Sequence, residues 1–174
     1  MAIFSIKSKL PPPEKPNENQ GDWKAAENEL GTALPADYKD FINTYGSGKI
    51  LDFLIVLNPF STRKNINLIS RMLMQSAVFK ELEDEYDIKC PFPVYPERGG
   101  ILPCALTDNG DVIFWITNGN PNEWNIIINE SRGPDYESIN LNIVDFITYF
   151  ISGEIKTKTI PDISQFGDKG FKPI

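Results

Sequence analysis

Residues 46–49 form the motif GSGK, which combines glycines and a lysine as phosphate-binding loops do. Such loops follow a strand and open a helix, so that the N–H groups of the helix meet the anion. Here the order is reversed, because the motif follows a helix predicted over 35–45 and precedes an apolar, strand-like run over 50–57. We therefore interpret the glycines as a turn that ends the helix.

Carboxylates are the next residues that could do chemistry, because the chain contains no histidine and so lacks the commonest general base and zinc ligand. Asp108 and Asp111 are the first and last residues of the sequence DNGD, which lacks the longer spacing and distal glutamate of a calcium loop. We interpret it as turn chemistry. The spacing of Asp84, Glu85 and Asp87 does not indicate that any two of these carboxylates point into a common site. We expect no catalytic residues and no enzyme activity.

The two cysteines, Cys90 and Cys104, do not form a CxxC motif and cannot supply a four-ligand metal site. We interpret both as small buried side chains of a reduced protein, while a single disulfide stays open as an alternative. The sequence predicts neither a bound metal nor a cofactor.

The net charge of −7 and an isoelectric point of about 4.7 describe an acidic protein. A field of this sign repels nucleic acid and anionic membranes and attracts basic partners. The apolar run at the N-terminus is too short for a signal segment, and no stretch reaches the roughly 18 apolar residues of a membrane span. We expect a cytoplasmic protein that binds neither nucleic acid nor membranes directly.

Helices and strands alternate along the chain in a pattern typical of an α+β fold. Apolar spacing predicts helices over 23–30, 35–45, 63–86 and 141–151. Pro35 suits the first position of the second helix. The predicted N-caps of the other three are Asp22, Ser61 or Thr62, and Asn140 or Asn142. Strands are predicted over 50–57, 101–107, 112–117 and 124–130. The turn at Asn109 and Gly110 favours a hairpin. We expect a mainly antiparallel meander covered by helices on one face.

The chain divides by composition into three parts. Residues 1–21 are predicted to be an N-terminal arm with a proline-rich linker, because prolines and polar residues dominate 9–22. Residues 22–155 hold all the predicted elements and form the domain. Residues 156–174 are predicted to be an irregular C-terminal tail.

Four segments in the same order resemble the SMI1/KNR4 family, also called the SUKH superfamily. They are "W..AENELGTALPADYKDFINTYGSG", "FLIVLNPF", "GGILPCALTDNGDVIFWI" and "EWNIII". The motif LPxDYxxFxxxYG(x)G is the most specific of them. On their own physical reading, the matching residues cap, turn and pack the elements: Trp23, Leu34, Pro35, Tyr38, Phe41, Tyr45, Gly46, Gly48, Gly110 and Trp124.

The resemblance implies an α+β immunity-type fold. Most bacterial members of the family resemble antidotes to polymorphic toxins, often nucleases or deaminases, whereas fungal members resemble scaffolds or regulators of cell-wall synthesis. We therefore expect a non-catalytic immunity protein that occludes a cognate toxin. A scaffold or regulatory module is the alternative, and an enzyme that uses carboxylates or lysine is the third hypothesis.

The acidic surplus indicates how such a partner would be bound, because carboxylates can mimic phosphates in a basic cleft and steer the encounter. The densest acidic cluster closes the helix predicted over 63–86. The candidate partner-binding residues are Glu81, Glu83, Asp84, Glu85 and Asp87, with Asp52 and Trp115 as further candidates. We expect the partner to be a basic protein toxin and the chain to be a monomer or a weak dimer.

Overall fold

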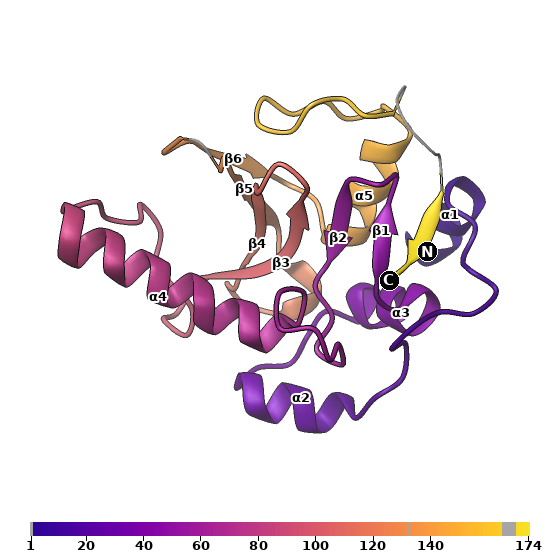
Figure 1. Ribbon diagram of the computed structural model, residues 1–174, viewed down its shortest axis with the longest axis horizontal. Coiled ribbons are helices and arrows are strands. Elements are labelled where there is room, and N and C mark those ends of the chain that lie inside the picture. The colour runs from indigo at the N-terminus through magenta and orange to yellow at the C-terminus, as the bar shows by residue number, and fades with distance from the viewer. Residues whose placement is uncertain (1, 132, 165–169) are drawn as a thin grey trace.

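Seven strands form one sheet in the computed structural model, which describes residues 2–131, 133–164 and 170–174 (Figure 1). Their order across the sheet is β6-β5-β4-β3-β2-β1-β7, and every neighbouring pair is antiparallel. The strands are β1 (Gly48–Ile50), β2 (Leu54–Val56), β3 (Ile101–Thr107), β4 (Val112–Ile116), β5 (Ile126–Asn129), β6 (Tyr136–Ile139) and β7 (Phe171–Pro173). The first six strands form a meander, and β7 pairs with β1. The expected α+β class and mainly antiparallel sheet are confirmed.

The predicted central hairpin consists of β3 and β4, which turn at Gly110 with a φ of +93°. Side chains of β4 alternate between two buried faces. Ile113 and Trp115 join the main core, whereas Val112 and Phe114 join a smaller apolar cluster on the other face. Because both faces are covered, the strand is apolar throughout rather than alternating.

In the described part of the chain, five helices flank the sheet, and they lie on both faces. They are α1 (Ala2–Lys9), α2 (Trp23–Leu30), α3 (Ala36–Tyr45), α4 (Leu68–Tyr86) and α5 (Ile143–Ile151), with a short 3-10 turn at Pro121–Glu123. Residues from α1, α2, α3 and α5 form the main core with Trp115. Helix α4 covers the second face, where the ring of Phe79 lies 6.1 Å from that of Phe114. The expectation that helices cover only one face is therefore wrong.

Two of the predicted helix caps are present. The Asp22 side chain accepts a hydrogen bond from the Ala25 N–H at 3.0 Å, and Asn142 caps α5 by accepting from the Asp145 N–H at 2.8 Å. Pro35 occupies the cap position before α3 rather than its first turn. Gly46 ends α3 with φ +66° and ψ −147°, a conformation open to glycine alone, although it is not the left-handed helical cap expected.

The apolar run over 50–57 is a tight hairpin rather than the predicted single strand. Leu51 and Asp52 both have positive φ, +52° and +55°, and the Phe53 N–H returns to the Ile50 carbonyl at 3.0 Å. Asp tolerates this conformation, but a leucine in it carries strain. The apolar composition hid the turn, since both short strands are buried on their inner side.

Helix α4 begins five residues later than predicted, at Leu68. The predicted caps, Ser61 and Thr62, belong to a preceding loop, and Asn67 is the cap instead. The Asn67 side chain accepts from the Ser70 N–H at 3.0 Å and donates to the carbonyls of Pro59 and Ser61 at 3.0 and 2.9 Å. One asparagine thus starts the helix and holds the loop.

The segments outside the predicted domain are part of the same fold. In the segment predicted as an arm, Ile6 of α1 and Leu10 are fully buried, and the Tyr45 hydroxyl donates to the Leu10 carbonyl at 2.6 Å. In the segment predicted as an irregular tail, Ile160 is buried and β7 extends the sheet. Residues 165–169 of that tail lie outside the described residues. Among the helices that the structure describes, none has the length and apolar character needed to cross a membrane.

Candidate partner-binding surface

The acidic cluster predicted from the sequence lies on one exposed end of the molecule. Helix α4 extends beyond the sheet, away from the group formed by α1, α3 and α5 (Figure 1). Its last two turns and the residue that ends it, Asp87 with φ +54°, carry the cluster. The structure brings five of the candidate residues together there, all exposed: Glu81, Glu83, Asp84, Glu85 and Asp87. The ammonium group of Lys89 lies 3.4 Å from Glu83, so one carboxylate is partly neutralised.

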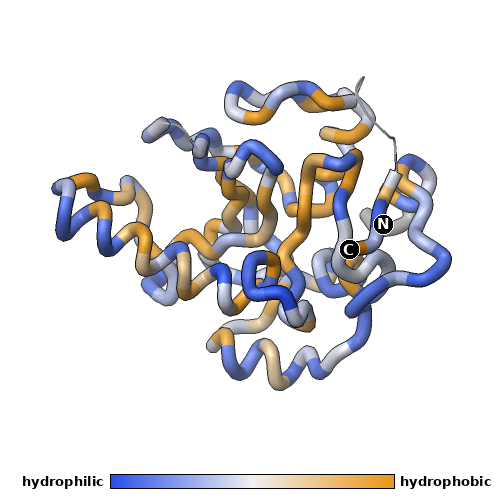
Figure 2. Tube along the Cα trace, in the orientation of Figure 1, coloured by the Kyte–Doolittle hydropathy of each residue, from blue (hydrophilic) through white to orange (hydrophobic). Residues whose placement is uncertain are grey.

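Apolar side chains are exposed beside this cluster. Leu73, Met74 and Val78 are 61%, 45% and 41% exposed, and the spacing of Met74 and Val78 places them one turn apart on α4. Tyr86 and Ile88 are exposed at the end of the same helix. Apolar and charged positions are interleaved along α4 in Figure 2. Adjacent exposed apolar residues of this kind mark interaction surfaces.

The sequence pattern predicted a helix here from its apolar spacing and did not reveal this exposed apolar surface. Only Leu68 and Phe79 are fully buried along the 19 residues of α4. The number of apolar residues in α4 could have revealed the surface, because it exceeds what one buried stripe needs.

Two candidate residues do not join this surface. Trp115 is fully buried in the main core, with its ring 4.9 Å from Tyr38 and 5.9 Å from Trp124, so it is not available to a partner. Asp52 is exposed, but it lies in the turn between β1 and β2, where its carboxylate pairs with the Lys172 ammonium at 2.6 Å. The sequence could not separate core from rim for a tryptophan on a strand.

The aromatic residues of the family motif pack the helices against the sheet. The Tyr38 hydroxyl donates to the Leu57 carbonyl at 2.5 Å, and Phe41 stacks on Tyr45 at 4.6 Å. The Trp23 indole lies 4.6 Å from the Phe60 ring and donates to the Asn43 side chain at 3.0 Å. These contacts give the aromatic positions of the motif a structural role.

The other motif residues fill close contacts and turns. Leu34, Pro35 and Trp124 are buried. A Cβ atom at Gly48 would lie 2.3 Å from the Phe171 ring, so the motif glycine leaves room for β7. These positions pack the main core and the β1–β7 contact and do not form part of the candidate surface.

The carboxylates of Asp111 and Asp37 have structural partners. Asp111 accepts from the Thr107 hydroxyl at 2.7 Å and from the Ser131 N–H at 3.0 Å, which closes the turn after β3. Burial raises the pKa of Asp37, which accepts from the Val144 N–H at 3.4 Å. Burial and the charge of Asp37 raise the pKa of Cys104. Both cysteines are free thiols, with Cys90 half-buried rather than fully buried as expected. Within the described residues, no group of three or more His, Cys, Asp or Glu side chains could hold a metal ion.

Comparison with known proteins supports the resemblance seen in the sequence. A family model described as SMI1-KNR4 cell-wall, SUKH_6, matches residues 20–147. No curated protein and no solved structure matches the chain. The matched segment runs from the residues before α2 to the middle of α5 and includes the motif residues described above. Since it spans more than half of the sequence, the chain belongs to the SMI1/KNR4 family of SUKH-type proteins.

Proposed function

We propose that this protein is a non-catalytic immunity protein, which binds a cognate toxin inside the cell that makes it and blocks the toxin's active or functional surface. The observation that carries the proposal is the exposed end of α4, where five carboxylates lie beside exposed apolar side chains. Family membership is consistent with an immunity-type role.

The composition of this surface suits a basic partner such as a nuclease or deaminase. Carboxylates on a rigid helix can occupy the phosphate-binding positions of a basic cleft and accelerate the encounter. Apolar side chains such as Leu73 and Met74 would then bury area at the centre of the contact. In such an interface, charged side chains accelerate association, and buried apolar side chains supply most of the affinity.

A scaffold or regulatory role is the second candidate, because the matching family model is described as cell-wall. Such a module would use the same exposed helix to dock a partner without inhibiting it. The two functions therefore differ in the effect of binding rather than in the surface.

Co-expression separates these functions. The polypeptide encoded by the neighbouring gene is expressed with and without this protein, and growth and co-purification are measured. We expect this protein to restore growth and to co-purify with that polypeptide at a fixed ratio. Co-purification without restored growth would favour the scaffold, and restored growth with no complex would contradict inhibition by binding.

A further inference from the structure

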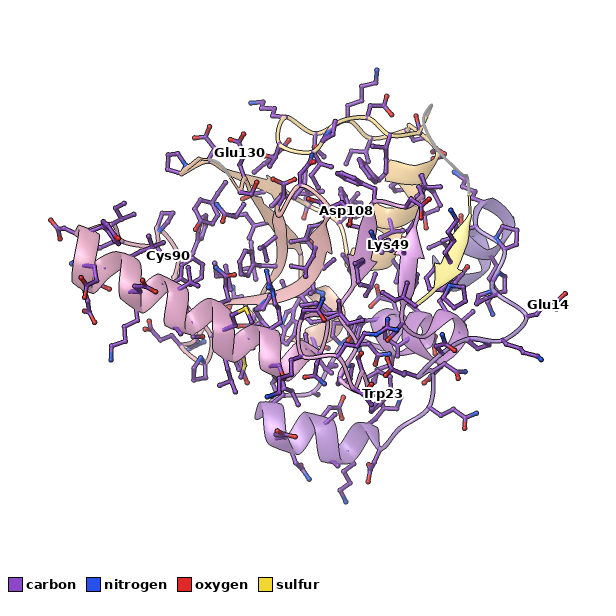
Figure 3. All side chains as sticks on the ribbon, viewed as in Figure 1. Glu14, Trp23, Lys49, Cys90, Asp108 and Glu130 are labelled. Carbon is purple, nitrogen blue, oxygen red and sulfur yellow. The ribbon has the colours of Figure 1, made fainter. Side chains whose placement is uncertain are left out.

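A groove lies between α4 and the edge of the sheet formed by β4, β5 and β6. Its volume is about 680 Å³, within the range of sites that bind small ligands or peptide side chains. Val78, Phe79 and Leu82 form the helix wall, and Val112 and Tyr136 lie on the sheet wall. Figure 3 labels two further wall residues, Cys90 in the segment after α4 and Glu130 after β5.

Arg71 lies at this groove, and no carboxylate among the described residues forms an ion pair with it. Its Nε is buried and has no hydrogen-bond partner in the described part of the chain, and a terminal guanidinium nitrogen donates only to the Met74 sulfur, at 3.3 Å. Thioether sulfur is a weak acceptor. Burying part of a guanidinium without an anion beside it is unfavourable, and burial lowers the pKa of Arg71.

The absence of a partner is unexpected in a chain with 24 acidic and 17 basic side chains. Glu130 lines the same groove, yet it forms no ion pair with Arg71 within 4.0 Å. Among the described residues that line the groove, Lys89 is the other basic one, and it already pairs with Glu83. Within that described set, Arg71 is the cation that lacks a complementary charge.

We propose that the groove binds a peptide segment of a partner protein in which an apolar side chain adjoins a carboxylate. The carboxylate pairs with the Arg71 guanidinium, and the apolar side chain lies in the groove against Val78 and Leu82. A guanidinium suits this task because its fork of N–H donors matches a carboxylate in two hydrogen bonds. The proposal concerns the inner side of α4 and stands whether or not the partner is a toxin.

The test uses the purified full chain and two probes that differ only in charge, N-acetyl-phenylalanyl-aspartyl amide and its asparaginyl counterpart. The Nε–Hε resonance of Arg71 and the groove amides are followed by NMR during titration. We expect saturable shifts, with a Kd for the acid on the order of 1 mM and about tenfold tighter than for the amide. The wild-type comparison alone tests the proposal without any substitution.

Three variants identify the role of Arg71. R71M should remove the preference for the acid and keep or raise the Tm, because it removes an unpaired cation; a merely structural arginine would lower the Tm. R71K should retain part of the preference, since an ammonium offers charge without the fork. E130Q should bind the acid two- to threefold more tightly, because it removes a repelling carboxylate.

Several results would overturn the proposal. Equal affinity of the wild type for acid and amide would exclude recognition of the carboxylate. An unchanged Arg71 Nε–Hε resonance at saturation, or no saturable shift in the groove, would exclude the site. A preference that persists in R71M would assign the carboxylate to another cation.

Discussion

The carboxylate of Glu18 accepts a hydrogen bond from the backbone N–H of Thr62 at 2.8 Å. The Thr62 hydroxyl, at 2.9 Å, and the Ser47 hydroxyl, at 2.7 Å, donate to the same carboxylate. One side chain thus joins the proline-rich segment, the turn after α3 and the loop before α4. This connection explains why the segment expected to be a separate arm is part of the fold.

Replacing Glu18 by glutamine should lower the free energy of unfolding at pH 7 by about 1 kcal/mol, because charge-assisted hydrogen bonds become neutral ones. Solvent limits the size of the effect, since Glu18 is only half-buried. Urea unfolding of E18Q measures it. E14Q is the matched control, because Glu14 is exposed on the same segment.

The contribution of Glu18 should also depend on pH. Burial acts to raise the pKa of Glu18, but the hydrogen bonds from Thr62, Ser47 and Ser61 outweigh it and hold the pKa at about 2, below the ordinary 4.5. A folded-state pKa below the unfolded one stabilises above the unfolded value, so the contribution is complete above about pH 4.5 and is lost as the pH falls toward 2. The stability difference between wild type and E18Q should shrink over that window. A difference that stays constant from pH 6 to 2.5 would contradict the assignment.

Gly46 should tolerate no side chain. An ideal Cβ there would lie 1.9 Å from the Asn17 carbonyl oxygen, and the φ of +66° is unfavourable for other residues. We expect G46A to lower the free energy of unfolding by about 3 kcal/mol or more. Gly99 also has positive φ, but no atom lies within 4 Å of its Cβ position, so G99A should cost only about 1 kcal/mol. Equal losses would mean that the contact with Asn17 contributes nothing.

Phe171 should stabilise the domain although it lies near the C-terminus. Its ring is 5.1 Å from Tyr45 and 6.5 Å from Phe41, and its strand pairs with β1. F171A should lower the free energy of unfolding by about 2 kcal/mol, less than for a fully buried ring. K172A, which removes an exposed ion pair with Asp52, should change it by less than about 1 kcal/mol. If F171A leaves the free energy of unfolding unchanged, β7 does not stabilise the domain.

The parts of the fold that the sequence predicted are those set by local chemistry. Asp22 and Asn142 cap helices because their side chains reach N–H groups three residues away, and Gly110 turns a hairpin because its φ is positive. The parts that it missed depend on distant partners. Neither the polar composition around Glu18 nor the single aromatic residue Phe171 near the C-terminus indicates a contact with residues more than 25 positions away.

The candidate surface was predicted only in part, for a related reason. A run of carboxylates is solvated wherever it lies, so the acidic end of α4 could be recognised from sequence. Burial of an apolar residue depends on the number of elements that cover it, which explains why Trp115 is in the core and Leu73 is exposed. Arg71 carried no signal at all, because its significance comes from a partner that the fold does not supply.

Charge reversal at the end of α4 tests the proposed interface. Lysine at Glu81, Asp84 and Glu85 changes the charge of the candidate surface, while lysine at Glu14, Glu29 and Asp40 makes the same change at exposed positions on other elements. The overall charge is equal in the two variants, so any difference between them comes from location. The toxin used is the polypeptide that stops growth in the co-expression test and co-purifies with this protein when growth is restored.

The association rate constant of each variant with that toxin is measured at low and high salt. We expect reversal on α4 to lower the rate constant on the order of tenfold at low salt, the matched control to stay near wild type, and the difference to vanish as salt screens the charges. Equal rate constants for the two variants at low salt would contradict a toxin contact at this surface.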